Sequence, residues 1–381
     1  MLNNLDKLRG ATRERPKYEV IKEFLLEEFM KGSYSDGEAL PSENTLAKTV
    51  GVARSTVRQA IGELENEGLV KRIQGKGSYF VGNSKQNAVQ QLEVFSLIVP
   101  DIARGLYPTL TKGFDHQAGL THQQIMVCNT NFDISKQGNI ILQMIDKNVV
   151  GVVLVPALSP PTPPFHVRQL QKNGIPVVFC HRPVPECTAP LITWSAEEVA
   201  RMAGQAFLDK GHRRIAYFAR YRYLQTEGYE NGLRQVLTEH GADLPPTRVF
   251  YGSDLVDTPQ ERTMKSQALK SMLETNEPIT AIFCHDDDEA ELIHHLAMEM
   301  GIRVPEHLSL IGFGDSHDRT GVFRSRLSSV AVNEFDIGAR AARVLQEMIG
   351  GERLVDSDEV IYKSLTLVEG TTLGAVPKQR V

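Results

Sequence analysis

Arginine and short hydroxyl side chains lie together on one face of a predicted helix that begins near residues 53–55 and ends at Gly68. Its apolar residues recur at helical spacing, at Val57, Ala60, Ile61 and Leu64. The opposite face carries Ser55, Arg58, Gln59 and Gly62. An arginine can donate two hydrogen bonds to O6 and N7 of guanine, and short hydroxyls and helix N-termini bind phosphates. This set of side chains is therefore suited to contact a nucleic-acid groove.

The elements that would position this face form three helices followed by a hairpin. Residues 16–31 predict the first helix, and Ser42 is the expected N-cap of a short second one. Gly51 makes the turn to the third helix, and residues 69–81 predict a hairpin with Gly75-Lys76-Gly77 at its tip. Periodicity alone fits two structures equally well: a helix-turn-helix that enters a major groove, and a plain three-helix bundle with a solvated charged face.

The charge distribution favours a nucleic-acid contact in the N-terminal part. The net charge of the whole chain is −5, which excludes a uniformly basic nucleic-acid coat protein. Residues 1–82 carry 13 Lys or Arg against 12 Asp or Glu, whereas the remainder carries 29 against 35. A small, locally basic segment thus precedes a large acidic body, as expected for an N-terminal module that faces phosphate.

The segment ALPSENTLAKTVGVARSTVRQAIGELENEGLVKRIQGKGSYFV resembles the GntR family of bacterial regulators, and the matching spacing extends over residues 16–82. The resemblance implies a winged helix-turn-helix that binds double-stranded DNA. Two residues depart from the family: Asn44 replaces an arginine, and Ala53 replaces the Ser or Thr that usually caps the recognition helix. The implied DNA contacts are Ser42, Asn44, Arg54, Ser55, Thr56, Arg58, Gln74, Gly75 and Lys76.

From Val94 onward, short apolar runs alternate with amphipathic helical stretches. The runs are FSLIV (95–99), QIMVC (124–128), VGVVLV (150–155), IPVVF (175–179), RIAYF (214–218), RVFY (248–251), TAIFC (280–284) and LSLIG (308–312). Runs that are apolar on both faces indicate strands buried between two helix layers, and hence parallel α/β sheets. About 285 residues are too many for one small sheet, so we expect two α/β lobes.

This second region resembles the LacI-type sensor domain, which is related to periplasmic sugar-binding proteins. Nine motifs occur in the right order over nearly all of residues 94–372, among them GIPVVFCHR, TEGYENGLRQVL and LSSVAVNEFDIGARAARVL. The expected domains are therefore a GntR-type winged-helix domain (1–82), a polar linker (83–93) and an effector-binding and dimerisation domain (94–381). The expected lobes are 94–191 plus 328–349 and 192–327 plus 350–381, with crossings near Ile192–Trp194, at Leu327–Val332 and after Ile349.

The candidate effector site lies beyond the carboxyl ends of the strands, where open α/β sheets bind ligands. Carboxylates, amides and arginine there suit hydroxyl groups, and aromatic faces suit C–H surfaces. Four residues depart from the sensor family: His181 replaces Asp, Asp286 replaces Asn, Gln225 replaces Arg, and Gly314 replaces an acid. Because the usual arginine is lost at 225, we expect a neutral sugar as effector. The expected effector-binding residues are Tyr107, Asp133, Arg182, Trp194, Tyr221, Gln225, Asp286 and Asp315.

Two of these residues have a competing structural interpretation. Trp194 fits a place in the core or hinge as well as a ligand platform. The acids of Asp286-Asp287-Asp288-Glu289 follow one another directly, so their side chains point in different directions, and they fit the start of a helix better than a metal cluster. We therefore expect neither a metal nor a cofactor.

Other function classes lack their sequence signatures. Four cysteines without paired spacing argue against a disulfide scaffold or a zinc ribbon. No apolar segment of a signal peptide is found, and no stretch approaches the roughly 18 apolar residues of a membrane span, so a soluble cytoplasmic protein without membrane contact is expected. No GxSxG, P-loop or HExxH motif points to an enzyme. A solute-binding protein or an enzyme acting on a sugar is the alternative to a regulator.

The combination of a GntR-type reader with a LacI-type sensor resembles arabinose-responsive chimeric repressors. It implies a sequence-specific DNA-binding transcriptional regulator, expected to repress carbohydrate-utilisation genes as a homodimer. Two winged helices in a dimer meet two half-sites, so the operator should be an inverted repeat. A small sugar-like effector is expected to modulate or release DNA binding.

Overall fold

The computed structural model describes residues 16–81, 93–121, 123–252, 258–315 and 327–377. Contacts divide the chain between Leu92 and Glu93 into two units, and the described part of each has its own hydrophobic core. Of the expected linker, residues 83–92 lie outside the described residues.

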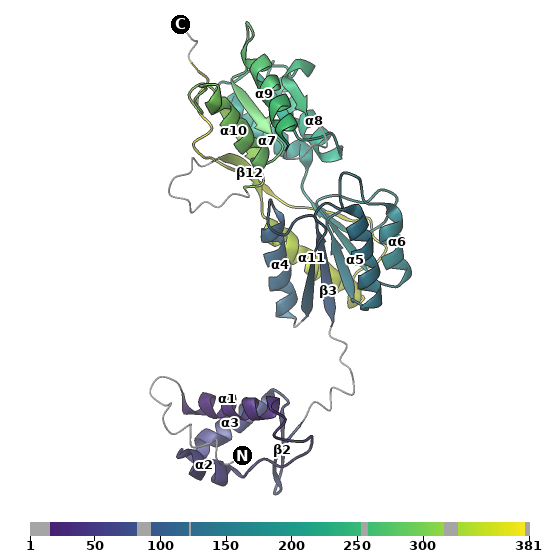
Figure 1. Ribbon diagram of the computed structural model, residues 1–381, viewed down its shortest axis with the longest axis vertical. Coiled ribbons are helices and arrows are strands. Elements are labelled where there is room, and N and C mark those ends of the chain that lie inside the picture. Colours follow the sequence, from purple (N-terminus) through teal and green to yellow (C-terminus); the bar gives the residue numbers. More distant parts are fainter. Residues whose placement is uncertain (1–15, 82–92, 122, 253–257, 316–326, 378–381) are drawn as a thin grey trace. The chain divides into compact units, whose positions relative to one another are not determined.

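The N-terminal unit consists of three helices followed by a two-stranded antiparallel sheet (Figure 1). Its elements are α1 (Lys17–Met30), α2 (Glu43–Val50), α3 (Arg54–Asn66), β1 (Val70–Ile73) and β2 (Gly77–Phe80). Leu25 of α1, Leu46 of α2 and Ile61 of α3 meet in one core. The predicted helix-turn-helix with a hairpin wing is therefore confirmed.

The ends of the two central helices differ in how they are capped. The Ser42 hydroxyl accepts a hydrogen bond from the Thr45 N–H at 3.1 Å and so caps α2, as predicted. Gly51 ends α2 in the left-handed region at φ +74°, where a side chain would be strained. Ala53 is the N-cap residue of α3, and its side chain makes no capping hydrogen bond. The structure thus confirms that α3 lacks the side-chain cap that a Ser or Thr at position 53 would supply.

The first lobe of the C-terminal unit is a six-stranded parallel sheet in the order β13-β7-β6-β5-β3-β4. Helices α4 and α11 pack on one face of it, and α5 and α6 pack on the other (Figure 1). Its strands are β3 (Val94–Val99), β4 (Gln124–Asn129), β5 (Gly151–Leu154), β6 (Val177–Cys180), β7 (Leu191–Thr193) and β13 (Val360–Tyr362). Its helices are α4 (Tyr107–Leu120), α5 (Ile134–Asp146), α6 (Pro164–Lys172) and α11 (Glu334–Ile349).

The second lobe repeats this plan with a sheet in the order β14-β12-β11-β10-β8-β9, in which only the β12–β14 pair is antiparallel. Helices α7 and α8 cover one face, and α9 and α10 cover the other. Its strands are β8 (Ile215–Ala219), β9 (Val249–Tyr251), β10 (Ala281–Cys284), β11 (Ser309–Phe313), β12 (Ser328–Val332) and β14 (Leu365–Val368). Its helices are α7 (Ala196–Asp209), α8 (Leu224–Glu239), η3 (Pro246–Arg248), α9 (Pro259–Leu273) and α10 (Asp287–Glu299). The predicted two-lobed α/β fold is confirmed.

The sheet order differs from the expected lobe boundaries at three short strands. Most of β7 and all of β13 were expected in the second lobe. The two strands instead pair with each other in the first sheet. β12 was expected in the first lobe but pairs with β11 and β14 in the second. Strands of three to five residues carry too little pattern to specify a sheet, so pairing decides where they belong. The chain thus crosses between lobes after β7, after β12 and between β13 and β14.

Ala53→Ser is expected to stabilise the N-terminal unit. A serine hydroxyl at this N-cap, where φ is −67° and ψ is 145°, can accept a hydrogen bond from the first turn of α3, which contributes about 1 kcal/mol. Chemical denaturation followed by circular dichroism should show a higher midpoint for this unit. Ser42→Ala removes the cap of α2 and should lower the midpoint by a similar amount. Unchanged midpoints in both variants would contradict the assigned helix starts.

Acidification is expected to destabilise the C-terminal unit through His212. This imidazole is fully buried, 2.9 Å from the Thr280 hydroxyl and 3.1 Å from the Gly374 carbonyl oxygen. Burial lowers its pKa, although the contact with Gly374 opposes the shift. Below about pH 6.5 the unfolded chain therefore binds a proton that the folded state resists, so the free energy of unfolding falls as the pH falls.

Urea denaturation at pH 7.5 and 5.5 measures this effect, and His212→Gln is the variant to compare with the parent chain. The glutamine does not titrate, so the difference in unfolding free energy between the two pH values should shrink. An equal difference in both proteins would show that His212 does not carry the pH dependence.

Candidate functional sites

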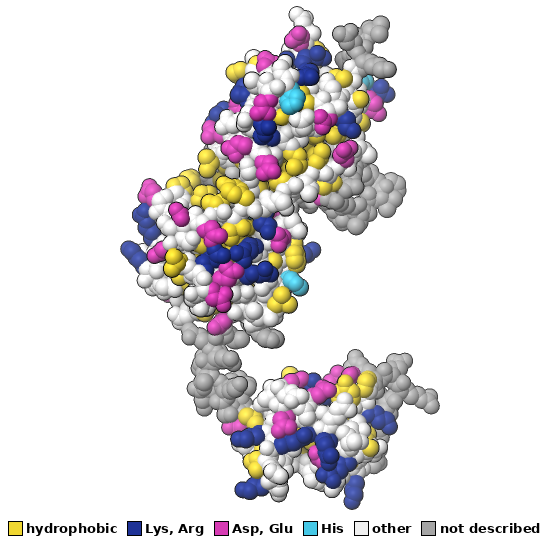
Figure 2. Space-filling model, turned by 180° about the vertical axis from the view of Figure 1, so that it is seen from behind, with side chains coloured by type: hydrophobic (Ala, Val, Ile, Leu, Met, Phe, Trp, Pro, Cys, Tyr) yellow, Lys and Arg dark blue, Asp and Glu magenta, His cyan; other side chains and the backbone are white. Residues whose placement is uncertain are grey.

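The exposed surface of α3 carries the residues predicted to contact DNA. Its apolar stripe, which includes Val57 and Leu64, is fully buried in the core, and this turns Ser55 and Arg58 outward. Arg54 is exposed as well, whereas Thr56 is only partly exposed. Figure 2 shows Lys and Arg side chains gathered toward the lower edge of the N-terminal unit.

Glu43 of α2 brings the two arginines of α3 together. One of its carboxylate oxygens, Oε2, accepts from Nε of Arg54 at 2.8 Å and from Nε and Nη2 of Arg58 at 3.3 Å. Burial works against ionisation of Glu43, but the hydrogen bonds from both arginines outweigh it and lower the pKa of the carboxyl. The sequence analysis missed this role, because no periodic rule links Glu43 to residues in the next helix.

Arg72 of β1 connects the wing to the same helix. Its Nη2 donates to the Arg58 carbonyl oxygen at 2.7 Å, and its Nε lies 3.6 Å from Glu65 of α3. The wing tip at Gln74, Gly75 and Lys76 is exposed, and Gly75 has a φ of +78°, which a side chain would strain. Ser42 and Asn44 are exposed at the start of α2. All nine predicted contacts therefore belong to one small, continuous domain, and their contact with DNA remains a prediction.

In the C-terminal unit, His181 lies where the two lobes meet. It follows β6 at a φ of +69°, a left-handed conformation that is costly for histidine, and it is 3% exposed. Its carbonyl oxygen accepts from Thr193 Oγ1 at 2.6 Å and from Gln225 Nε2 at 2.7 Å. Gln225 of α8 thus joins the second lobe to the first through a hydrogen bond to the backbone.

Trp194 lies at the crossing that follows β7. Its indole N–H donates to the Tyr229 hydroxyl at 3.0 Å, and its ring lies 4.9 Å from the rings of both His181 and Phe313. The side chain is only 6% exposed. This environment matches the hinge interpretation of Trp194, while a contact with effector stays a prediction.

Four other predicted residues lie within electrostatic reach of one another. The Tyr107 ring stacks on His181 at 5.7 Å, and Arg182 Nε donates to the Pro156 carbonyl oxygen at 2.6 Å. Burial raises the pKa of Tyr221, the charge of Arg182 opposes that shift, and Tyr107 and Asp286 add to it. Arg182, Tyr221 and Asp286 each follow the carboxyl end of a strand, where open α/β sheets bind ligands, and Tyr107 opens the helix that follows β3. Arg220 also opposes the shift in Tyr221, and it is not among the residues expected to bind effector.

Asp286 combines a helix cap with a charge pair. Its Oδ1 accepts from the Glu289 N–H at 2.7 Å at the start of α10, and its Oδ2 lies 3.0 Å from Nε2 of His285. Burial favours the neutral acid, but the charges of His285 and Arg220 outweigh it and hold the pKa of Asp286 well below its ordinary value. The following helix begins at Asp287, as expected.

The remaining two predicted acids occupy different places. Asp133 caps α5 by accepting from the Ser135 and Lys136 N–H groups at 2.8 and 3.1 Å, and it is exposed. Asp315, at a φ of +51°, lines a cavity of about 370 Å³ between the lobes, together with Leu106, Thr109, Gly314, Thr366 and Glu334. Any contact of either acid with effector remains a prediction.

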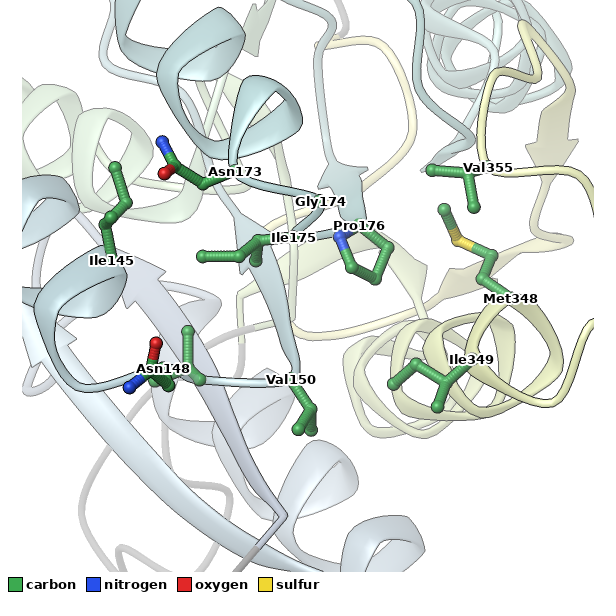
Figure 3. A pocket seen from close by; sticks show the side chains of 11 residues that line it. Ile145, Asn148, Val150, Asn173, Gly174, Ile175, Pro176, Met348, Ile349 and Val355 are labelled. Atoms are coloured by element: carbon green, nitrogen blue, oxygen red, sulfur yellow. The ribbon is translucent and has the colours of Figure 1, made fainter. Parts of the chain in front are cut away.

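A second cavity, of about 470 Å³, lies at the amino ends of β5 and β6 (Figure 3). Ile145, Val150, Ile175, Met348 and Val355 are among its walls, and none of the residues that line it is charged. Open α/β sheets bind ligands at the carboxyl ends of their strands, so the place of this cavity at the amino ends does not fit an effector site.

Within the described ranges, no group of three or more His, Cys, Asp or Glu side chains is placed to hold a metal ion. None of the helices in those ranges combines the length and the apolar character that a bilayer crossing needs.

Comparison with known families finds one match for each unit. Residues 17–80 match the bacterial regulatory proteins of the gntR family, and residues 205–373 match the periplasmic binding protein-like domain. The two matches lie in the same order as the two units of the chain.

Among curated proteins, relatives extend over both units. An arabinose metabolism transcriptional repressor from Geobacillus stearothermophilus is 26% identical over 361 residues, which cover 94% of this chain and 98% of that protein. One from Halalkalibacterium halodurans is 24% identical over 96% of this chain and 99% of that protein. Catabolite control protein A of Priestia megaterium is 29% identical over 72% of this chain and 80% of that protein.

Solved structures show the fold of the larger unit. The transcription regulator CcpA of Lactococcus lactis superposes with a TM-score of 0.63 at 20% identity and covers 73% of this chain and 98% of that one. A LacI family transcriptional regulator from Enterococcus faecium, solved with bound ribose, gives a TM-score of 0.62 at 18% identity over 75% of this chain and 100% of that one.

Proposed function

We propose that this chain, which carries a GntR-type helix-turn-helix domain and a periplasmic-binding-protein-like domain and is homologous to arabinose metabolism transcriptional repressors, is an effector-gated repressor of carbohydrate-utilisation genes. It is not an enzyme: its work is to bind an operator and to release it when a small sugar-like molecule binds. Because its target is chromosomal, the proposal places the protein in the cytoplasm.

The cluster of Arg54, Glu43 and Arg58 on the exposed side of α3 carries the proposal. Arg54 uses only Nε toward Glu43, and its two Nη groups have no other partner among the described residues. When a carboxylate binds Nε of an arginine, the guanidinium group is fixed and its remaining donors stay oriented for phosphate or guanine. The wing adds Lys76 next to glycines, which allow close approach to the DNA backbone.

We further propose that two copies of the chain act together. A winged helix in each copy would meet one half of an inverted repeat, with half-site centres about 34 Å apart or a multiple of that distance. A single copy offers too few base contacts for a specific genomic site, whereas two copies share one long operator.

The effector is proposed to be a neutral sugar that binds between the lobes. Gln225 occupies a position where the resembling sensor family has arginine, and its amide is engaged with the His181 carbonyl oxygen. Tyr107, Tyr221 and Asp286 supply the aromatic and acidic groups that a polyhydroxy ligand needs. Binding would close the lobes, shift the dimer interface and move the two winged-helix domains out of register with their DNA half-sites. A coupling free energy of about 1–3 kcal/mol is enough for a 5- to 150-fold change in DNA affinity.

A solute-binding protein is the competing function, because it uses the same two-lobed fold. The match of residues 17–80 to a DNA-binding family disfavours it. Salt dependence separates the two, since DNA affinity falls log-linearly with salt concentration when phosphates are contacted.

Arg58→Ala is expected to weaken specific DNA binding by about 1–3 kcal/mol while sugar binding stays intact. The reason is the loss of a donor pair on the recognition helix. The measurement is a gel shift on duplexes that the parent chain selects from a random library, repeated at several salt concentrations.

Arg201→Ala is the matched control, because Arg201 is also a surface arginine paired with a glutamate, Glu239, but it lies in the C-terminal unit. Its DNA affinity should equal that of the parent chain. If Arg58→Ala bound the selected duplexes as tightly as the parent, the assignment of α3 as the recognition helix would be wrong.

Effector binding is expected to change the fluorescence of Trp194 in a saturable way. Trp194 is the one tryptophan of the chain, and it contacts His181, Phe313 and Tyr229 at the crossing between the lobes. Lobe closure alters these contacts. The titration uses L-arabinose, D-ribose, D-xylose, D-galactose and D-glucose, with the phosphorylated forms alongside, and Trp194→Phe controls for signal from tyrosine.

Thermal shift on the same panel gives an independent measure, since a ligand that binds only the folded state raises the melting temperature. A response to phosphorylated sugars alone would refute a neutral effector. A sugar that stabilises the protein without changing Trp194 fluorescence would contradict closure at this hinge.

A further inference from the structure

Arg72 is the last side chain before the wing tip that faces the recognition helix α3. Successive side chains of a strand point to opposite faces, so Arg72 shares the face of Val70, which is buried in the core of the domain. Lys71 and Ile73 take the opposite face of β1 and are exposed. The alternation of the strand therefore turns an arginine toward α3 at the position where an apolar side chain would be expected.

Three residues of α3 receive this arginine. Positions 58, 62 and 65 are spaced four and three apart, so they lie along one side of the helix. Nη2 of Arg72 donates to the Arg58 carbonyl oxygen at 2.7 Å, and the Arg72 backbone N–H donates to Oε1 of Glu65 at 3.2 Å. Gly62 lies between the two and has no side chain that would displace the guanidinium; a Cβ there would lie 3.8 Å from Nη2.

The base and the tip of the hairpin are held differently. At the base, the Phe80 N–H donates to the Glu38 carbonyl oxygen at 2.8 Å and so ties β2 to the rest of the domain. At the tip, the hydrogen bonds among the described residues stay inside the hairpin, as where the Lys76 N–H donates to the Ile73 carbonyl oxygen at 2.9 Å. A two-stranded hairpin is only marginally stable by itself. Arg72 is therefore the contact nearest the tip that fixes it relative to α3.

We propose that Arg72 is a positioning residue for DNA binding: by linking the wing to the Arg58 carbonyl oxygen, it sets the distance between the wing tip and the recognition helix, so that Lys76 and Arg58 contact one duplex together. The inference rests on the proposed function and adds a residue that is not among the nine expected DNA contacts. Arg72 acts through the hairpin and not through a contact of its own with DNA. Without it, the wing tip has to be ordered when DNA binds, and this ordering lowers the affinity.

The test is a double-mutant cycle of Arg72→Met and Lys76→Ala in the full chain. Fluorescence anisotropy measures affinity at several salt concentrations for duplexes that the parent chain selects from a random library. Lys76→Ala should make the slope of log affinity against log salt concentration shallower by about 1 for each copy of the chain, because one phosphate contact is lost. Arg72→Met should lower the affinity about 2- to 10-fold and make the slope shallower by the same amount. In the Arg72→Met background, Lys76→Ala should cost little more, because the tip is no longer held on the phosphate.

Additive losses in the double variant would overturn the proposal, since Lys76 would then contact DNA whether or not Arg72 holds the wing. An unchanged salt slope in Lys76→Ala would overturn it as well, because the wing tip would not reach a phosphate. Lys71→Met is the matched control: it removes a positive charge from the opposite face of the same strand, and its effect should add to that of Lys76→Ala. If this pair were non-additive too, the coupling would belong to the whole hairpin and not to Arg72.

Arg72→Lys separates position from charge. The lysine keeps the positive charge and most of the aliphatic stem but lacks Nη2, the atom that reaches the Arg58 carbonyl oxygen. Its affinity and its cycle with Lys76→Ala should therefore resemble those of Arg72→Met, and full recovery of both would show that charge alone suffices. Thermal unfolding checks that each variant folds, and this milder substitution carries the test should Arg72→Met fail to fold.

The failure of this inference differs from failure of the proposed function. A parent chain that selects no duplex from the library refutes DNA binding, and the role of Arg72 with it. A parent chain that binds its selected duplexes, together with an Arg72→Met variant that binds them equally well and with the same salt slope, refutes the positioning role alone.

Discussion

The link between the two lobes of the C-terminal unit depends on the hydrogen bonds that the carbonyl oxygen of His181 accepts, because one donor comes from each lobe. Thr193 donates to it from the first lobe and Gln225 from the second, at 2.6 and 2.7 Å. The left-handed backbone of His181 costs on the order of 1–3 kcal/mol, and the contacts around it must offset that cost. The side chain contributes further, through Glu334 and the stacked ring of Tyr107. Backbone strain, a buried hydrogen bond to Glu334 and the contact between the lobes are thus concentrated in one residue.

The N-terminal unit must accommodate two positive charges that lie close together. Two arginines close together on α3 repel each other, and Glu43 offsets that repulsion while leaving further guanidinium donors for a ligand. Arg72 fixes the wing against the same helix through the Arg58 carbonyl oxygen. Contacts with the Arg58 carbonyl oxygen and with the Glu43 carboxylate therefore preorganise this surface. Preorganisation reduces the entropy cost of ordering it when DNA binds.

Much of the fold follows from the sequence because its strongest signals are long or repeated. All eight apolar runs form strands; those inside the sheets are buried on both faces, as parallel strands between helix layers are, whereas the edge strands β4 and β9 are less buried. The lobe membership of β7, β12 and β13 did not follow, because strands this short are assigned by their hydrogen-bond partners rather than by their own pattern. The sequence could place Tyr107, Arg182, Tyr221 and Asp286 near one another because each comes just after a strand or opens the next helix, and strand ends converge; their contact with effector stays a prediction. The contact between Glu334 and His181 was not predicted, because the two residues lie 153 positions apart and nothing local relates them.

The energetics of the crossing bear on how the proposed effector would control DNA binding. A single hydrogen bond contributes about 0.5–1.5 kcal/mol net, and the coupling needed for regulation is about 1–3 kcal/mol. The free energy of the Gln225–His181 hydrogen bond is therefore similar to the coupling free energy that the proposed regulation needs. A stronger contact would lock the lobes, and an effector can shift an equilibrium only by its difference in affinity for the two states. The apolar interiors of the lobes, with Phe95 and Phe283 fully buried, are close-packed, whereas the contacts at the crossing combine the apolar Trp194–Phe313 ring contact with the polar Gln225–His181 hydrogen bond. A contact between the lobes whose free energy is close to the proposed coupling can be broken when an effector binds, and the Gln225–His181 hydrogen bond is a contact of that size.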